Sequence, residues 1–324
     1  MYKRFFNLQQ NPFEITPDPK FLFATPKHNE ALAALYYGVQ RRKGFVVMTG
    51  EVGTGKTLIV RCLLELLTRV HATYAYVFNS RLSPEEFLRY IAGDFGIPAR
   101  GKPKGELLLD LSTYLVERYQ KKFPAVLVVD EAHHLSGEVL EEIRLLTNLE
   151  TADQKLLQIL LVGQPELELK LDSPDLCQLK QRIAWRSHLD PLSREETFGY
   201  IQRRLHIARA NAHAPFIFPD ETVSVIYRHS RGIPRLINTV CENALIIAYA
   251  KQARIVTPAV VDEVAHDLRL GVVSVPVEEQ RPREDEELHQ AVKTLLHFSE
   301  TLRLARAPEK KAVVPVTAGG ELGE

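Results

Sequence analysis

The sequence of 324 residues is 45% hydrophobic and 25% charged, and its 41 Lys and Arg residues balance 41 Asp and Glu residues. This composition predicts a soluble globular protein with more than one domain, and it excludes an overall positive charge as the means of binding nucleic acid. Three widely spaced cysteines exclude a disulfide framework and a cysteine zinc site. The N-terminus lacks a secretory signal and no apolar run reaches the ~20 residues that cross a bilayer, so we expect a cytoplasmic protein with no transmembrane segment of its own.

Residues 1–26 place prolines among aromatic side chains such as Phe13 and Phe21. Proline fixes φ and lacks a backbone donor, so this stretch disfavours a long helix. We predict an extended N-terminal segment that its aromatic residues hold against the core of the following domain. Apolar residues then recur at helical spacing and predict a helix over about residues 28–40.

The stretch from Gly50 to Thr57 fits the phosphate-loop pattern G-x-x-x-x-G-K-[ST]. It lies between an apolar run of strand length, residues 45–49, and a helical pattern over residues 57–69, so a glycine-rich turn without a ligand is disfavoured. Lys56 is expected to reach the β- and γ-phosphates of ATP and Thr57 to offer its hydroxyl to Mg²⁺, with the N-terminal segment near the base. The candidate nucleotide-binding residues are Gly50, Glu51, Val52, Gly53, Thr54, Gly55, Lys56, Thr57 and Leu58.

An acidic pair follows the next buried strand. After a predicted strand over residues 73–78 and helices over about 84–95 and 106–121, residues 125–129 form a continuous apolar run. Asp130 and Glu131 come at its carboxyl end, where α/β proteins bind ligands. Asp130 suits a Walker B role that holds Mg²⁺, and Glu131 suits a general base that polarises the attacking water. The alternative is a pair of turn acids.

His133 and His134 complete a DEAH-like string. We interpret them as loop residues that support the site, because the sequence shows no further ligand cluster for a metal. A helix is predicted over residues 138–149 and a buried strand over 156–162. Gln164 follows this strand, and an amide at that place can hydrogen-bond the γ-phosphate or the attacking water. It is our candidate sensor; the alternative is an ordinary turn residue before proline.

Residues 176–183 are predicted to be helical and to be followed by a short fifth strand near residues 186–189. Arg182 stands where this helix ends, placed to project towards a neighbouring subunit. Because an arginine stabilises charge on the transferring phosphoryl group, Arg182 is our candidate for a finger that acts in trans. The alternative is a solvated basic helix end.

From residue 193 the pattern is helical, with helices predicted at about 194–211, 220–229, 233–251 and 258–269. Arg235 lies in the first turn of the third, where the helix dipole disfavours a cation. We therefore predict that it contacts the phosphates of the nucleotide; the alternative is a structural salt bridge.

These elements define the predicted fold class, a five-stranded parallel α/β nucleotide-binding domain with helices on the sheet and a small all-helical lid. The predicted divisions are the N-terminal segment 1–26, the nucleotide-binding domain 27–192, the lid 193–270, a linker 271–284, an amphipathic helix 285–306 and a disordered tail 307–324.

The whole pattern resembles the AAA+ superfamily of P-loop ATPases. Three more specific stretches, residues 11–22, 49–57 and 145–167, are similar to the GspA/ExeA-type ATPases of bacterial type II secretion and related pilus and exopolysaccharide systems. The last includes Thr-Asn-Leu-Glu and Gly-Gln-Pro-Glu-Leu strings. The resemblance covers residues 1 to about 270 and implies a Mg-dependent ATPase that forms homo-oligomers, often rings. It also supports individual roles: Lys56 and Thr57 for phosphate and Mg²⁺, Asp130 and Glu131 as Walker B, Gln164 as sensor 1, Arg182 as finger with Arg186 as its rival, and Arg235 as sensor 2.

The secretion ATPases continue into a membrane span and a peptidoglycan-binding domain, whereas this sequence ends in a predicted helix and tail. We therefore expect a separate envelope or membrane partner, with the protein peripheral to the inner membrane. The leading function is ATP hydrolysis that drives assembly or remodelling of a cell-envelope export machine. One alternative is a DNA-binding regulator of the TniB type, because basic residues could form a stripe on the surface. These basic residues are Lys180, Arg182, Arg186, Arg194, Arg203, Arg204 and Arg209, and Glu195 and Glu196 interrupt the stripe. A second is a slowly hydrolysing scaffold.

Overall fold

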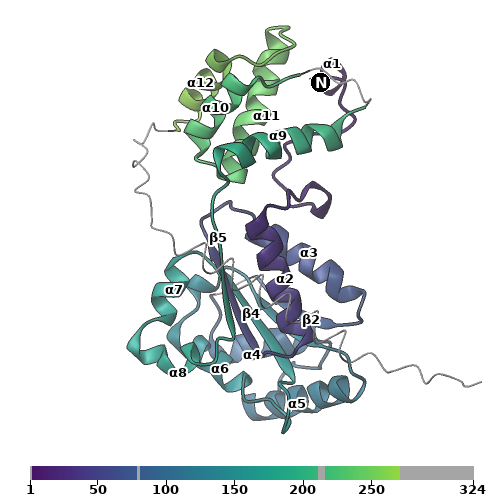
Figure 1. Ribbon diagram of the computed structural model, residues 1–324. Coiled ribbons are helices and arrows are strands. Elements are labelled where there is room, and N and C mark those ends of the chain that lie inside the picture. Colours follow the sequence, from purple (N-terminus) through teal and green to yellow (C-terminus); the bar gives the residue numbers. More distant parts are fainter. Residues whose placement is uncertain (1, 79–80, 211–215, 271–324) are drawn as a thin grey trace, which may run out of the picture. The chain divides into compact units, whose positions relative to one another are not determined.

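The computed structural model describes residues 2–78, 81–210 and 216–270, and five parallel strands in the order β2-β3-β4-β1-β5 form a sheet with helices on both faces (Figure 1). The strands are β1 (Phe45–Gly50), β2 (Thr73–Val77), β3 (Ala125–Val129), β4 (Leu157–Gly163) and β5 (Trp185–Leu189). All four pairings between neighbours are parallel. The predicted fold class is confirmed, and β4, which precedes Gln164, lies beside β3, which precedes Asp130.

Both faces of the sheet are buried because successive strand side chains point to opposite sides. Phe45 and Val47 of β1 pack with one hydrophobic cluster, whereas Val46 and Met48 pack with another. The first cluster is covered by helices α4 (Pro84–Asp94), α5 (Lys104–Gln120), α6 (Gly137–Leu146), α7 (Glu166–Leu171) and α8 (Cys177–Lys180). The second is covered by α2 (Pro26–Gln40) and α3 (Lys56–Thr68). This explains why the strands read as continuous apolar runs.

A helical part follows the sheet and has a hydrophobic core of its own. Its helices are α9 (Arg194–Ala208), α10 (Asp220–Ser230), α11 (Pro234–Ala250) and α12 (Pro258–Asp267). Ser193 begins α9 with a capping box in which its hydroxyl accepts from Glu196 N. Between α10 and α11, Gly232 has φ +73° and its carbonyl accepts from Leu192 N at 2.9 Å. A Cβ there would lie 1.9 Å from the Leu192 carbonyl oxygen, so only glycine fits.

The N-terminal segment matches the expectation of an extended strip on the nucleotide-binding part only around residues 17–22, where Arg61 of α3 donates to the Pro17 carbonyl at 2.6 Å and Leu22 packs against the second cluster of the sheet. It begins with a short helix, α1 (Tyr2–Phe5), and contains a 3₁₀ turn, η1 (Pro19–Phe21). Phe6 and Phe13 are buried with the hydrophobic core of the helical part rather than with the sheet. The apolar faces of α9 and α11 provide the surface that these aromatic side chains cover, and no local pattern identifies that partner.

Two further local predictions need correction. Residues 176–183 do not form one helix but a 3₁₀ turn, η3 (Pro174–Leu176), followed by the single turn of α8. His133 and His134 lie in a 3₁₀ turn, η2 (Ala132–His134), rather than in a loop.

The linker, amphipathic helix and tail predicted for residues 271–324 lie outside the described residues, and the domain limits at 26 and 192 stay predictions. No helix among the residues that the structure describes is long and apolar enough to cross a membrane.

Candidate functional site

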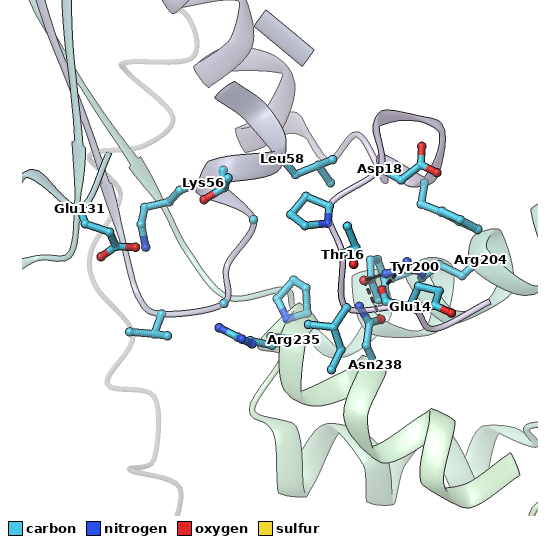
Figure 2. Close-up of a pocket in the computed structure, with 18 of the residues that line it drawn as sticks. Glu14, Thr16, Asp18, Lys56, Leu58, Glu131, Tyr200, Arg204, Arg235 and Asn238 are labelled. Atoms are coloured by element: carbon cyan, nitrogen blue, oxygen red, sulfur yellow. Dashed lines mark hydrogen bonds between the residues drawn. The ribbon is translucent and has the colours of Figure 1, made fainter. Parts of the chain in front are cut away.

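A pocket of about 370 Å³ lies where the phosphate loop, the strand ends, the lid helices and the N-terminal segment meet (Figure 2). Lys56, Thr57, Glu131 and Gln164 line one part of it. Tyr200, Arg204 and Asn238 line another, together with residues 14–18 of the N-terminal segment. Figure 2 shows Lys56 and Glu131 at a distance from the Tyr200, Arg204 and Thr16 side chains. The predicted phosphate-binding residues therefore line one end of the pocket, and a different set of residues lines the other end.

The phosphate loop has the backbone conformation that its glycines allow. Gly53 has φ +86° and Gly55 has φ +104°, a left-handed region where other residues are strained. Gly53 also touches the lid: its carbonyl accepts from Arg235 N at 3.2 Å, and a Cβ at Gly53 would lie 2.7 Å from Arg235 Cβ. The N-terminus of α11 therefore packs directly on the loop, and Arg235 lines the pocket. Its contact with the phosphates stays a prediction.

The Lys56 ammonium is buried against the loop. Its Nζ donates to the carbonyls of Gly50 at 2.7 Å and Glu51 at 2.9 Å. Burial lowers the pKa of Lys56, and the nearby carboxylates of Glu131 and Asp130 oppose that shift. A partly desolvated ammonium beside a phosphate loop is suited to bind phosphate oxygens.

Oxygen ligands for a hard cation meet beside the loop. Thr57 Oγ1 donates to Asp130 Oδ2 at 3.2 Å, which puts a hydroxyl and a carboxylate at one point, as Mg²⁺ requires. Tyr76 on β2 also donates to Asp130 Oδ2, at 2.7 Å, and Glu131 N donates to Oδ1 at 2.9 Å. Burial raises the pKa of Tyr76, and Asp130 adds to the effect. The sequence analysis missed Tyr76, because one tyrosine in an alternating strand carries no signal of its partner.

Glu131 has a backbone conformation that non-glycine residues seldom adopt, with φ 52° and ψ 36°. Such a conformation costs about 1–3 kcal/mol and persists only where the surroundings impose it. Here it turns the chain at the end of β3, and the Glu131 side chain lines the pocket with Lys56 and Gln164. This geometry suits the predicted role as general base.

Gln164 does not stand alone. Its side-chain Nε2 lies 2.9 Å from His133 Nε2, and His133 Nδ1 lies 3.6 Å from Glu131 Oε2. One ligand atom from each of Glu131, His133 and His134 falls within 4.8 Å of the others, a donor set that matches zinc. The sequence analysis saw no third ligand for the two histidines; the turn at Glu131 provides one. Both ring nitrogens of His133 already contact Gln164, Nε2 through the side-chain amide and Nδ1 through the backbone N–H at 3.4 Å.

The two candidate finger residues lie outside the pocket lining. Arg182 Nη1 donates to Thr147 Oγ1 at 2.7 Å and to Asn148 Oδ1 at 2.6 Å, so the Thr-Asn pair of the Thr-Asn-Leu-Glu string holds it within its own chain. Arg186 contacts Asp172 at 3.1 Å. The action of either arginine in trans stays a prediction.

Arg204 is a buried cation that the sequence analysis placed only in a basic stripe. It is 5% exposed, and it donates to the Pro12 carbonyl at 2.6 Å, the Tyr200 hydroxyl at 2.5 Å and the Glu14 carbonyl at 3.2 Å. Its guanidinium also lies 4.6 Å from the ring centroid of Phe21. A signal was present: in α9, position 204 falls on the helical face of the buried residues 201, 205 and 208.

Comparisons with known proteins agree with this geometry. A family model described as an AAA domain matches residues 39–171. The chain is 45% identical over 252 residues to General secretion pathway protein A of Aeromonas hydrophila; the match covers 78% of this chain and 45% of that protein, so the chain spans less than half its length.

Two solved structures share the fold. The Cdc6p protein of Pyrobaculum aerophilum has a TM-score of 0.63 at 20% identity, covering 84% of this chain and 74% of that one. The ORC2 protein of Aeropyrum pernix has a TM-score of 0.62 at 18% identity, covering 82% and 73%. At these identities the likeness concerns the fold alone.

Proposed function

This chain is an AAA+ protein of the General secretion pathway protein A type, and from that premise we propose that it binds and hydrolyses ATP with Mg²⁺. The observation that supports this best is that Lys56, Thr57, Glu131 and Gln164 surround one end of a single pocket. The hydrogen bond between Thr57 and Asp130 completes the arrangement.

Each residue has a distinct part in the proposed reaction. Lys56 and the loop N–H groups would hold the β- and γ-phosphates, and Thr57 with Asp130 would hold Mg²⁺, which neutralises charge on the phosphoryl oxygens. Glu131 would accept a proton from the attacking water. Gln164 would orient that water or the γ-phosphate, and Arg235 would bring positive charge from the lid.

The cellular role that we propose is assembly or remodelling of a cell-envelope secretion or polysaccharide export machine. The identity to General secretion pathway protein A supports it. We further propose that the protein acts in the cytoplasm as a homo-oligomer, and that a separate partner protein brings it to the inner membrane.

A DNA-binding role receives less support from the geometry. Along the predicted basic stripe, Lys180 and Arg186 both contact Asp172, and Arg182 is held by Thr147 and Asn148. Arg204 is buried. Asp172 offsets part of the charge of Lys180 and Arg186, and Arg204 is internal, so less of the stripe is free for phosphates and we do not expect steeply salt-dependent DNA binding.

The experiment that tests the proposal is the ATPase rate per subunit against protein concentration, with Mg²⁺, at two salt concentrations, with and without double-stranded DNA. A rate that climbs with concentration and ignores DNA supports a self-assembling envelope ATPase. A negligible ATPase rate that rises only with DNA would instead support the DNA-binding regulator of the TniB type. Lys56→Ala should lose nucleotide binding, and Glu131→Gln should bind ATP without hydrolysing it; hydrolysis by Glu131→Gln at the wild-type rate would refute the assignment of the base.

The proposed finger has its own test. Arg182→Ala should keep ATP binding and lose hydrolysis, and mixing it with Glu131→Gln subunits should restore part of the activity. Thr147→Val is the matched variant, because it removes one of the two acceptors of Arg182 and leaves the arginine in place. Absence of rescue in the mixtures would indicate that Arg182 acts within its own subunit.

A further inference from the structure

The Thr-Asn-Leu-Glu string has no part in the reaction proposed above, but its first two residues contact Arg182. Thr147 ends α6 as its C-cap, and Asn148 follows it. Arg182 Nη1 donates to Thr147 Oγ1 at 2.7 Å and to Asn148 Oδ1 at 2.6 Å. Because an arginine Nη carries two protons, these two bonds engage both of them. The pair therefore holds the guanidinium by one of its three nitrogens.

The other two nitrogens of Arg182 are left for a ligand. In the part of the chain that the structure describes, neither Nε nor Nη2 donates a hydrogen bond. Their N–H groups lie side by side on one edge of the guanidinium, an arrangement that binds two oxygens of a phosphate at once. Two carboxylates that interact with the charge of Arg182, Glu141 and Glu150, are already paired with Arg144 and Lys155. The described residues thus leave the Nε–Nη2 edge open to an anion.

The two acceptors of Arg182 are themselves fixed. Thr147 is buried, and its hydroxyl donates to the Arg144 carbonyl at 2.6 Å, so the lone pairs of Oγ1 face the guanidinium. Lys155 Nζ donates to the Thr147 carbonyl at 2.9 Å, and Asn148 N donates to the Leu145 carbonyl at 3.0 Å. The carboxyl end of a helix also favours a cation. The guanidinium is therefore oriented before any ligand arrives.

Arg182 lies at the edge of the sheet opposite to its own phosphate loop. Strands β1 and β5 are parallel, with Val46 opposite Trp185 and Gly50 opposite Leu189. The loop begins at Gly50, at the carboxyl ends, whereas Arg182 comes before Trp185, at the amino ends. Four strand residues, or ~13 Å, separate the two levels. Arg182 is also absent from the lining of the pocket. This placement favours a phosphate that belongs to another molecule.

We propose that Thr147 and Asn148 are positioning residues for an arginine that acts in trans. They hold Nη1 of Arg182, and its Nε–Nη2 edge binds two oxygens of the γ-phosphate of ATP in the pocket of a second copy of the chain. A guanidinium that is fixed in advance loses less conformational entropy on binding, and it stabilises the charge on the transferring phosphoryl group. This inference rests on the proposed ATPase function and deepens it, because it gives the Thr-Asn pair a role between subunits.

The test measures kcat at saturating protein concentration and the Kd for MgATP. Asn148→Leu removes an acceptor at an exposed position, whereas Asn148→Asp keeps one. We expect Asn148→Leu to lower kcat ~10- to 100-fold, as misplacement of a reacting group does, with the Kd within ~3-fold of wild type. Asn148→Asp should keep kcat within ~3-fold of wild type. Thr147→Val, without the hydroxyl, and Thr147→Ser, with it, should differ in the same way.

Gln181→Leu is the matched control. Gln181 precedes Arg182, and its side chain is an exposed amide that forms no hydrogen bond with the described residues. The same amide-to-leucine change there should leave kcat at the wild-type value. If Thr147→Val fails to fold, the exposed Asn148 variants still test the inference.

Combined variants test coupling to Arg182 and action in trans. In an Arg182→Ala background, Asn148→Leu should cost no further activity, because Asn148 acts only through that arginine. Glu131→Gln subunits, in which the arginine and its two acceptors are intact, should raise the activity of Asn148→Leu subunits when the two are mixed. Glu131→Gln subunits that also carry Arg182→Ala should not raise it.

Three results would overturn the inference: wild-type kcat in both Asn148→Leu and Thr147→Val, losses that multiply fully with Arg182→Ala, or equal rescue by the two kinds of Glu131→Gln subunit. Hydrolysis by Arg182→Ala at the wild-type rate would overturn it too, while the ATPase function itself would stand. Failure of the proposed function is distinct, because then the wild-type protein would not hydrolyse ATP.

Discussion

Replacing Gly53 by alanine tests whether the contact between loop and lid belongs to the nucleotide-binding state. The new Cβ would lie 2.7 Å from Arg235 Cβ and 3.0 Å from Ile233 Cγ2, at a residue with φ +86°. A Cβ at positive φ costs about 1–2 kcal/mol, and loss of the bond from Arg235 N to the Gly53 carbonyl costs about 0.5–1.5 kcal/mol. With a further cost of up to about 1 kcal/mol for displacing α11, the closed arrangement loses about 1.5–4.5 kcal/mol.

If MgATP binds the closed arrangement, Gly53→Ala should weaken its binding by roughly 10- to 1,600-fold, since each 1.4 kcal/mol is tenfold. The assay is titration of a fluorescent ATP analogue with Mg²⁺. Gly105→Ala is the matched control, because Gly105 lies in α5 with nothing within 4 Å of the added Cβ. It should bind normally and be slightly more stable. A Kd for Gly53→Ala within twofold of wild type would refute the reasoning.

Three other predictions follow from single contacts. Tyr76→Phe removes a donor from Asp130 Oδ2 and should raise several-fold the free Mg²⁺ needed for half-maximal ATPase; an unchanged requirement would contradict the contact's role. Arg204→Met leaves the Pro12 and Glu14 carbonyls without their donor and should lower the free energy of unfolding by about 3 kcal/mol in a denaturant titration, whereas Arg203→Met should have little effect. Burial raises the pKa of Glu242, which accepts from the Tyr2 hydroxyl at 2.8 Å, so folding favours the protonated carboxyl. Its contribution is complete below the unfolded pKa and is lost as pH rises through the folded value, so Tm measured from pH 4 to 7 should fall more for wild type than for Glu242→Gln.

Much of the fold and half of the site follow from local pattern. The apolar runs that end at Asp130 and Gln164 predict strands buried on both faces, because covering helices exclude water from every position. The phosphate loop is a contiguous motif whose glycines impose its backbone, so its residues and their role are evident from the sequence alone. The start of α9 is equally local, since a capping box needs only Ser193 and Glu196.

Only the tertiary structure decided which residues far apart in the chain contact each other. Tyr76 reaches Asp130, and His133 reaches Gln164, because β2 pairs with β3 and β3 pairs with β4. Arg204 donates a hydrogen bond to the Pro12 carbonyl, which lies 192 positions earlier in the chain. The order of the strands and the surface against which a helix packs depend on the packing of the whole chain. Residue type and spacing therefore do not indicate which distant residue completes a hydrogen bond.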